Sequence, residues 1–218
     1  MVAIACVLFP DFTQLDLTGP FEIFHRIPDA DVQLVAATAE PVVSEGGLAI
    51  VPTITFAEMA GCNVLFVPGG PGVNEAMLDD ELISFLQRHG EHAQWVTSAC
   101  TGALLLGAAG LLAGHNATTH WASMQFLEAF GAWPQEKRVC RSDNRITGAG
   151  VTAGIDVGLT VAELLCDVYV SEEIRLAIDY RPDLPGTDKT RAAVTEKLRP
   201  RMAERARAVQ QAARKLSS

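Results

Sequence analysis

Residues 97–115 read TSACTGALLLGAAGLLAGH and follow the short apolar pair Trp95–Val96. The apolar run predicts a buried strand over 95–97, and the small-residue stretch predicts a helix over 101–112. Cys100 falls at the predicted strand-to-helix turn, where a nucleophile is exposed above a sheet and the helix N-terminus favours a thiolate. Cysteine is also among the most often buried residue types. Local sequence leaves a chemical and a packing role for Cys100 equally open.

Short apolar segments alternate with helical segments along the rest of the chain. The predicted strands are 2–9, 32–38, 64–67, 95–97, 117–119, 138–140 and 145–147, with an edge ribbon at 48–54. The predicted helices are 20–27, 80–91, 101–112, 122–130, 152–169, one opening at 171–173, and a closing helix with an apolar stripe of Val194, Leu198, Met202 and Val209. The alternation predicts an α/β fold, a doubly wound and mostly parallel sheet flanked by helices on both faces.

The length of 218 residues suits one large α/β domain with a sizeable core. We predict one domain over 1–180, followed over 181–218 by a loop and a C-terminal helical extension that belongs to the same domain or to a dimer interface. Residues 189–218 carry nine Lys and Arg against two Glu, so this tail is +7 and the remainder −16. We interpret the tail as a solvated helix face against an acidic body, with an anionic partner as the alternative.

Composition excludes several classes of protein. The net charge of −9 argues against a general nucleic-acid binder. The apolar start MVAIACVLF is typical of a core strand rather than a signal peptide, and no apolar run approaches the ~18 residues of a membrane span. The five scattered cysteines form no CxxC pair, which indicates free thiols in a reducing, cytoplasmic setting and no structural zinc.

Four chemically distinctive features fall at predicted strand ends, where ligands of open α/β sheets collect. They are Asp16, the turn Pro68–Gly72, Cys100, and Gly148–Gly150 ahead of the long helix. Asp16 lies between two leucines, so it is either an N-cap of the next helix or a partly desolvated acid whose proton a reaction can use. The sequence therefore favours a site above these strand ends.

The remaining candidates are weaker. In the PGGPG turn, Gly69, Gly70 and Gly72 offer backbone amides for close ligand approach, although loop closure explains them equally well. The turn lacks the spacing of a phosphate or dinucleotide loop, so we predict no nucleotide cofactor. His120 stands at another strand end, either as half of a Cys100–His120 dyad or as a structural histidine. The histidines and acids show no metal-ligand spacing, so we predict no metal.

Four segments in order resemble the ThiJ/PfpI superfamily, which has a class I glutamine amidotransferase-like, flavodoxin-like fold. They are FPDFTQLDLTGPFEIF (9–24), VLFVPGGPGV (64–73), TSACTGALLLGAAGLLAGHNATTHW (97–121) and RITGAGVTAGIDVGLTVAELL (145–165). Asp16 within QLDLTGP, together with Thr101 directly after Cys100, is most similar to the isocyanide hydratases of that superfamily.

The resemblance implies a hydro-lyase that converts an isocyanide, R–N≡C, to an N-formamide without a cofactor. It implies that Cys100 forms a covalent thioimidate, that Asp16 acts first as acid and then as base, and that Thr101 orients Asp16 or Cys100 through its hydroxyl or amide. It also implies a homodimer, since members of the superfamily commonly dimerise.

One departure from the family pattern concerns the pocket. Related hydratases tend to have three glycines where this chain has Gly148-Ala149-Gly150, and Val151 comes next. We expect Ala149 and Val151 to contact the substrate pocket or the helix behind Cys100, so that the extra methyl changes rate or substrate range rather than reaction type.

Two alternatives remain at this point. The first is another enzyme of the superfamily, either glyoxalase- or deglycase-like, or an amidase that uses Cys100 with His120. The second is a non-enzymatic redox sensor in which Cys100 oxidises to a sulfinic acid. The superfamily also includes transcription regulators with an appended DNA-binding domain, but the chain has no room for a second domain of that size, which favours a stand-alone enzyme.

Overall fold

A seven-stranded sheet forms the centre of the molecule, whose computed structural model describes residues 1–181 and 205–216. The strand order is β10-β11-β7-β6-β1-β2-β5. The strands are β1 (Val2–Val7), β2 (Ala30–Ala36), β5 (Ile54–Thr55), β6 (Val64–Val67), β7 (Trp95–Ser98), β10 (Val139–Ser142) and β11 (Arg145–Gly148). All neighbours pair in parallel except the β10–β11 hairpin. The predicted mostly parallel sheet is confirmed.

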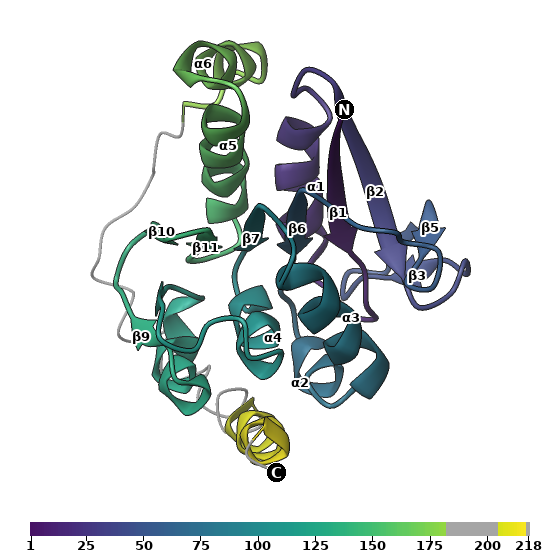
Figure 1. Cartoon of the computed structure of the whole chain (residues 1–218), viewed down its shortest axis with the longest axis vertical. Helices are drawn as coiled ribbons and strands as arrows, with labels where there is room; N and C mark the ends of the chain where they lie inside the picture. The colour runs from purple at the N-terminus through teal and green to yellow at the C-terminus, as the bar shows by residue number, and fades with distance from the viewer. Residues whose placement is uncertain (182–204, 217–218) are drawn as a thin grey trace.

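Helices cover both faces of this sheet. Figure 1 shows α1 (Gln14–Phe24) and α5 (Ala153–Leu165) on one side. On the other side lie α2 (Val73–Ala76), α3 (Asp80–Gly90), α4 (Gly102–Ala108) and the 3₁₀ helix η1 (Trp121–Phe130). Helix α6 (Val168–Ala177) continues beyond α5, and two small ribbons pair β3 (Val42–Val43) with β4 (Ala49–Ile50) and β8 (Asn116–Ala117) with β9 (Trp133–Pro134). The doubly wound architecture follows from these two layers of helices.

The central strands are buried on both faces and are mostly apolar, with the buried polar residues Thr97 and Ser98 at the end of β7. Every residue of β6 and β7 is buried, as is the C-terminal half of β1. Aromatic side chains join the layers: Phe24 of α1 packs edge-on against Phe66 of β6, and Phe56 stacks on Phe85 of α3. Near-continuous apolar strands of this kind are typical of parallel sheets covered by helices.

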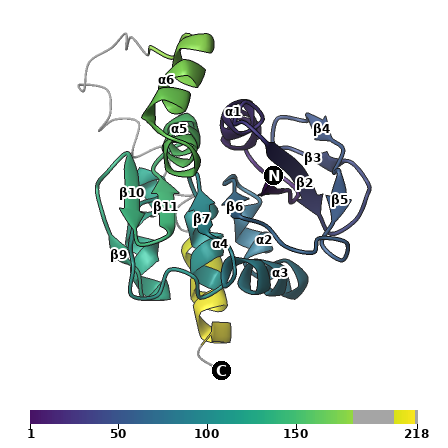
Figure 2. The same ribbon diagram turned by 45° about the horizontal axis from the view of Figure 1, so that its top comes forward.

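Helices α1 and α5 approach each other closely because glycines face the contact. A methyl group on Gly158 would lie 2.9 Å from Cβ of Ile23, and one on Gly154 would lie 2.9 Å from the ring of Pro20. Figure 2 shows the two helices side by side over the same part of the sheet. The close α1–α5 contact therefore involves the middle and the C-terminal part of α1, where Gly19, Pro20 and Ile23 lie.

The first helix begins earlier than predicted. It spans Gln14–Phe24 rather than 20–27, and Pro20 lies inside it. A Gly-Pro pair ordinarily interrupts a helix because proline removes a hydrogen bond to the residue four before it. Here Gly19 approaches Ile155 and Pro20 contacts α5, so packing offsets the lost bond. Asp16 thus lies in the first turn of α1, and its predicted N-cap alternative is wrong, because Thr13 holds that position.

Two other predicted elements are divided. The helix predicted over 152–169 stops at Leu165, and α6 restarts with Asp167, whose carboxylate accepts hydrogen bonds from the amides of Tyr169 and Val170. The edge ribbon predicted over 48–54 contributes to β4, which pairs with β3, and to β5 at the edge of the main sheet. The Asp167 cap and the strand pairings set the ends of these helices and strands, and the spacing of apolar residues does not reveal either.

The C-terminal part of the chain is helical over residues 205–216. Val209 and Ala212 are buried there, which agrees with the inward position predicted for Val209. The other stripe positions, Val194, Leu198 and Met202, lie outside the described residues, as does most of the predicted 181–190 loop. Within the described ranges, no helix has the length and apolarity to cross a bilayer.

Replacing Gly158 by Ala tests the α1–α5 contact. We expect a loss of about 1–2 kcal/mol in the free energy of unfolding, because the new methyl overlaps the β-branched side chain of Ile23, whose Cβ cannot rotate away. Urea denaturation measures the loss. Gly61→Ala is the matched control, since a methyl there meets no atom within 4 Å and stability should stay within about 0.5 kcal/mol. Equal stability of the two variants would contradict the close packing.

Candidate active site

Cys100 lies two residues after the end of β7 and has a left-handed backbone with φ of 53°. Such a conformation is costly for a residue with a Cβ and is found where a side chain must be aimed for function. The hydroxyl of Thr119 donates a 2.7 Å hydrogen bond to the Cys100 carbonyl and thereby holds the turn. The next helical residue, Gly102, lies so close to the carbonyls of Val67 and Pro68 that no side chain fits. The structure thus contains the predicted strand-to-helix turn.

Asp16 reaches Cys100 from α1 and is completely buried. Its Oδ2 accepts a 2.9 Å hydrogen bond from the amide of Gly69. Its Oδ1 has no hydrogen-bond partner of ordinary geometry among the described residues. The carboxyl and the Cys100 thiol are nevertheless close enough that each shifts the pKa of the other. Oδ1 is therefore the atom available to exchange a proton with Cys100 or with a bound molecule.

The pKa of Asp16 is raised from 3.8 to about 7. Burial is the main cause, because the carboxylate loses its hydration, and the negative charge of Glu45 adds to it. The Gly69 amide and the Cys100 thiol act in the opposite direction by hydrogen bonding to the carboxylate. A carboxyl that titrates near neutrality can serve as acid and as base in one cycle.

The pKa of Cys100 is raised, which corrects the expectation that the helix N-terminus would favour a thiolate. Burial is the largest cause and the neighbouring charge of Asp16 comes next. The amide of Thr101 and the charge of Arg205 lower the pKa without reversing the shift. Helix α4 has only seven residues, and its N-terminus does not outweigh desolvation. Cys100 therefore rests as a thiol, and forming a thiolate there needs a proton acceptor close by.

The Gly69–Gly70 turn ties Asp16 to Thr101. The amide of Gly70 donates to the Thr101 hydroxyl at 3.0 Å, and that hydroxyl donates back to the Gly70 carbonyl at 3.3 Å. A methyl on Gly69 would lie 2.5 Å from the amide nitrogen of Thr101 and 2.8 Å from Oδ2 of Asp16, so only glycine fits. Thr101 thus acts on Cys100 through its amide, while its hydroxyl is used by Gly70 and not by Asp16.

A cavity of about 420 Å³ lies over Cys100. The predicted residues Gly70, Thr101, His120 and Val151 line it, but Gly72 does not, because Gly72 packs against Pro10. The wall also contains residues that the sequence did not single out: Thr13, Glu45, Pro71, Asn74 and Arg205. Thr13, Glu45 and Pro71 come from loops, Asn74 from α2 and Arg205 from the C-terminal helix. Thr13 and Pro71 lie within the quoted segments 9–24 and 64–73, whereas nothing in the sequence marks Glu45, Asn74 or Arg205 as part of a site.

Ala149 faces a different space from the one expected. It lines a neighbouring cavity of about 470 Å³ together with Gly150, and it is not part of the Cys100 cavity wall. Its amide donates to the carbonyl of Arg138 at 2.9 Å. The added methyl therefore lies beside the Cys100 cavity, and Val151 is the residue of this loop that reaches it.

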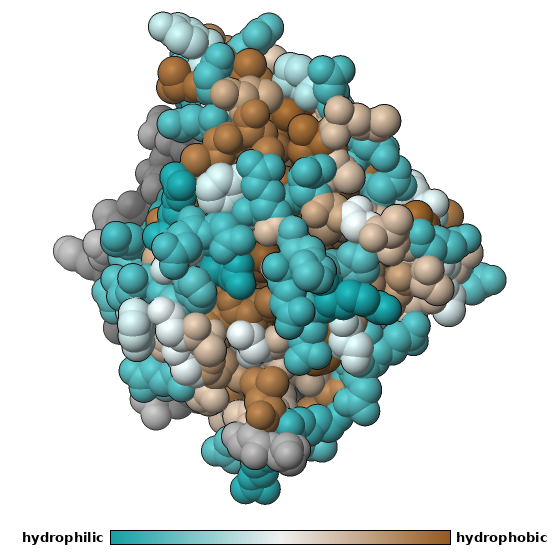
Figure 3. Space-filling view, viewed as in Figure 1, coloured by the Kyte–Doolittle hydropathy of each residue, from teal (hydrophilic) through white to brown (hydrophobic). Residues whose placement is uncertain are grey.

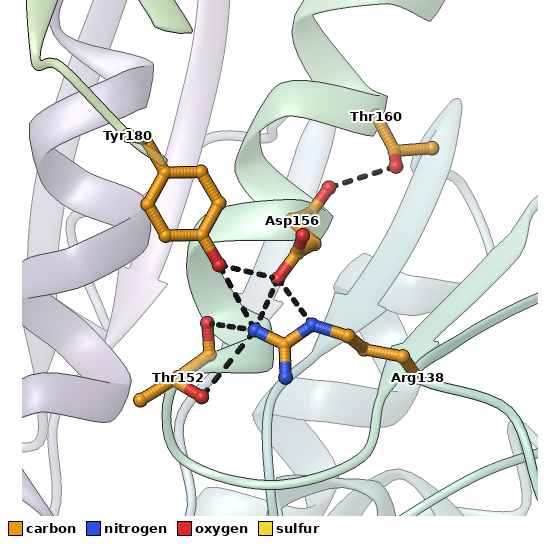
Figure 4. A network of polar contacts seen from close by, with 5 residues as sticks. All are labelled: Arg138, Thr152, Asp156, Thr160 and Tyr180. Carbon is orange, nitrogen blue, oxygen red and sulfur yellow. Dashed lines mark hydrogen bonds and ion pairs between the residues drawn. The ribbon is translucent and has the colours of Figure 1, made fainter. Parts of the chain in front are cut away.

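The loop carrying Val151 is held by a polar network around Arg138, shown in Figure 4. The guanidinium donates to Oδ2 of Asp156 at 2.8 Å, to the carbonyl of Thr152 at 3.1 Å and to the hydroxyl of Tyr180 at 3.0 Å. The Tyr180 hydroxyl donates in turn to the same Asp156 oxygen at 3.1 Å. These contacts join β10, the N-terminal turn of α5 and the residues after α6, so they fix one wall of the cavity from outside.

His120 lines the Cys100 cavity and also caps η1. Its Nδ1 accepts a 3.3 Å hydrogen bond from the amide of Ala122, so the neutral ring carries its proton on Nε2. Its pKa is lowered by burial and then by the positive charge of Arg205. The ring is thus a neutral structural cap with one edge at the cavity. Among residues 1–181 and 205–216, no three His, Cys, Asp or Glu side chains gather as metal ligands.

Comparisons with known proteins found a matching family model and proteins of similar sequence and structure. The model of the DJ-1/PfpI family matches residues 2–164. The chain is 43% identical over 204 residues to the isonitrile hydratase of Pseudomonas putida, which covers 92% of this chain and 90% of that protein. A solved ThiJ/PfpI family protein from Pseudomonas syringae has a TM-score of 0.92 at 40% identity, over 95% of this chain and 90% of that one.

A more distant similarity extends to transcription regulators. The HTH-type transcriptional regulator GbdR of Pseudomonas aeruginosa is 25% identical over 198 residues. The match covers 82% of this chain but 53% of the regulator. The chain therefore spans about half the length of that protein.

Asp16→Asn tests the burial of this carboxyl through stability. Below about pH 4 the carboxyl is protonated whether the chain is folded or not; between about pH 4 and pH 7 only the unfolded chain releases the proton, so the wild type loses stability as pH rises. We expect the variant to gain several kcal/mol over wild type across this interval and to plateau above it. Urea denaturation in buffers from acid to alkaline pH measures the difference, and a pH-independent difference would contradict the raised pKa.

Proposed function

The chain belongs to the DJ-1/PfpI family, and from this premise we propose that its Cys100 cavity hydrates organic isocyanides, R–N≡C, to N-formamides. The observation that carries the proposal is the buried pair formed by Cys100 and a carboxyl, Asp16, that titrates near neutrality. The similarity in sequence to an isonitrile hydratase over nearly the whole length of both chains supports it. Neither the pair nor the cavity wall requires a metal or an organic cofactor for this reaction.

The first step forms a carbon–sulfur bond. The terminal carbon of an isocyanide is carbene-like and accepts both a nucleophile and a proton. In the proposed step, Asp16 takes the proton of the Cys100 thiol as the sulfur attacks, and it passes that proton to the same carbon. Asp16 thus acts as base before it acts as acid, the reverse of the order that the resemblance implies, because the raised pKa of Cys100 keeps its thiol protonated at rest. The product is the thioimidate Cys100–S–CH=N–R, with Asp16 ionised as before. The two acid–base events occur at one carboxyl, which the free Oδ1 atom permits.

The second step adds water to the thioimidate carbon. Asp16 takes one water proton while the hydroxide adds to carbon, and the proton then goes to nitrogen, giving Cys100–S–CH(OH)–NH–R. Asp16 next transfers the hydroxyl proton to the departing sulfur, so that the carbon–sulfur bond breaks and O=CH–NH–R leaves. One water is consumed, and the Cys100 thiol and the Asp16 carboxylate are restored. Covalent catalysis thus replaces one difficult addition by two easier steps.

Backbone amides and a threonine hydroxyl around Asp16 and Cys100 hold the two side chains in position during both proposed steps. The Gly69 amide holds Oδ2 of Asp16, and Oδ1 is left for the proton transfers of the proposed reaction. The Thr101 amide interacts with the Cys100 sulfur and stabilises negative charge there as the bond forms. The Thr119 hydroxyl holds the turn of Cys100 in its strained conformation. Backbone donors fixed by the fold cost no reorganisation when charge develops.

The competing readings receive less support. A Cys100–His120 dyad needs a proton acceptor on the ring, yet Nδ1 of His120 is occupied by the Ala122 amide, and Asp16 rather than His120 is the side chain that affects Cys100 most after burial. A redox sensor built on Cys100 requires an easily formed thiolate, whereas the Cys100 pKa is raised. The proposed hydratase mechanism needs only a Cys100 thiol beside a carboxyl that titrates near neutrality.

Turnover of an aryl isocyanide tests the proposal. With 4-methylphenyl isocyanide, wild type should release the corresponding formamide, while Cys100→Ala and Asp16→Asn should each lose at least about a thousandfold in kcat/KM. His120→Ala should retain activity within about tenfold, because only a helix cap is lost. Product is measured by chromatography. No formamide from wild type would refute the function, and an inactive but folded His120→Ala would favour the dyad.

The pH dependence of kcat/KM in the same assay reports how Asp16 and Cys100 are protonated. The reactive form holds one proton between Asp16 and Cys100, and it replaces the doubly protonated form as pH rises through the Asp16 pKa of about 7. We therefore expect kcat/KM to rise with pH up to this value and then to level off. A flat profile from about pH 5.5 to pH 9 would contradict Asp16 as the acid–base group.

A homodimer is proposed as the assembly, following the resemblance to the superfamily. Figure 3 shows hydrophobic residues gathered over α5 and along its seam with α1. Leu15, on α1 at this seam, is 42% exposed. Exposed apolar surface of this kind is typical of association sites. Light scattering coupled to size exclusion should give twice the chain mass of 23.3 kDa, and a monomeric mass would refute the proposal.

A further inference from the structure

The C-terminal helix, residues 205–216, returns to the opening of the Cys100 cavity. It lies against the α4 and η1 side of the molecule, yellow in Figures 1 and 2. Its first residue, Arg205, lines the cavity together with Cys100. The nucleophile and this arginine are more than a hundred positions apart in the chain, so only the folded helix brings them together.

The guanidinium of Arg205 is fixed across three separate elements. Nε donates to Oδ1 of Asn74 on α2 at 3.0 Å, and Nη1 approaches the hydroxyl of Ser123 on η1 at 3.5 Å. Nη2 donates to the carbonyl of Gly70 at 3.2 Å. That carbonyl also accepts from the Thr101 hydroxyl, so Arg205 is attached to the turn that holds the reacting pair.

Four charged or titratable groups face Cys100, each from a different element. Asp16 comes from α1, Glu45 from the β3–β4 turn, His120 from the start of η1 and Arg205 from the C-terminal helix. Among the described residues of the cavity wall, Arg205 alone bears a permanent positive charge. Its charge lowers the pKa of Cys100, against the stronger effect of burial, and it lowers the pKa of His120 in the same direction as burial does.

We propose that Arg205 is a positioning residue for the hydration reaction, which holds the Gly70 carbonyl in place and stabilises the negative charge that develops on the Cys100 sulfur. The inference rests on the proposed function for its effect on turnover but not for its effect on Cys100. A cation at this wall favours the thiolate during attack, when the proton passes from sulfur to Asp16. Its hydrogen bond to Gly70 restrains the turn whose amides hold Asp16 and Thr101.

The far end of the same helix supplies a matched control. Lys215 donates to the carbonyl of Leu78 at 3.0 Å and pairs with Asp80 at 2.8 Å, away from the Cys100 cavity. Lys215→Met weakens the attachment of the helix without touching the guanidinium. If the effect of replacing Arg205 comes from its charge in the cavity, Lys215→Met should not show that effect.

The experiment compares alkylation of Cys100 by iodoacetamide in wild type, Arg205→Lys, Arg205→Met and Lys215→Met. Lysine and methionine have similar size, so the two Arg205 variants differ mainly in charge. At each pH between about 7 and 9, we expect Cys100 of Arg205→Met to react about five- to tenfold more slowly than that of Arg205→Lys. Peptide mass spectrometry follows Cys100, and the exposed Cys166 in the same sample should react equally in all four proteins.

Turnover supplies the second readout. We expect kcat/KM for 4-methylphenyl isocyanide to fall about tenfold or more in Arg205→Met, and partly in Arg205→Lys, which keeps the charge but loses the forked contact to Gly70 and Asn74. Lys215→Met should stay within about twofold of wild type.

Two outcomes would overturn the inference: equal Cys100 alkylation in Arg205→Lys and Arg205→Met, or equal loss of turnover in Arg205→Met and Lys215→Met. If no variant or wild type forms formamide, the proposed function fails, while the alkylation comparison still decides the role of Arg205.

Discussion

Burial of the Asp16 carboxyl beside the Cys100 thiol is the interaction on which the rest of the site depends. Both the Asp16 carboxyl and the Cys100 thiol are removed from water, so the pKa of each rises. Because the two groups interact, the protonation of one depends on the protonation of the other. A carboxyl that titrates near neutrality and a thiol that does not ionise alone form a proton-sharing pair. The unfavourable burial of Asp16 reduces stability at neutral pH, which is the usual relation between a functional site and the free energy of folding.

The fold positions this pair through backbone contacts rather than side-chain networks. Helix α1 packs closely against α5 at Gly154 and Gly158, and in the first turn of α1 the Asp16 carboxyl accepts a hydrogen bond from the Gly69 amide. On the other side of the pair, Thr119 holds the left-handed turn of Cys100. The glycines matter because a Cβ at these contacts would separate backbones that must touch. The position of the Cys100 sulfur is thus set by close backbone contacts around it.

The cavity, by contrast, is assembled from distant parts of the chain. Val151 is held from outside by the Arg138 network, and Arg205 arrives from the C-terminal helix. Ala149, which sequence comparison within the superfamily marked as a change in the pocket, faces a neighbouring cavity instead. The cavity wall therefore comes largely from loops and from the C-terminal helix, whereas Asp16 and Cys100 both belong to the first hundred residues.

Sequence alone placed Asp16, the Pro68–Gly72 turn and Cys100 at predicted strand ends, because parallel strands place their carboxyl ends at one edge of a sheet. The resemblance to the ThiJ/PfpI superfamily, rather than local sequence, then singled out Cys100 and Asp16 as a pair. The sequence predicted β6, β7 and α3 closely, since apolar periodicity and capping are local signals. It did not predict the start of α1, because α5 offsets the break expected at Gly19–Pro20. Only tertiary structure decided the raised pKa values and the presence of Arg205, since desolvation and contacts between remote segments have no signature along the chain.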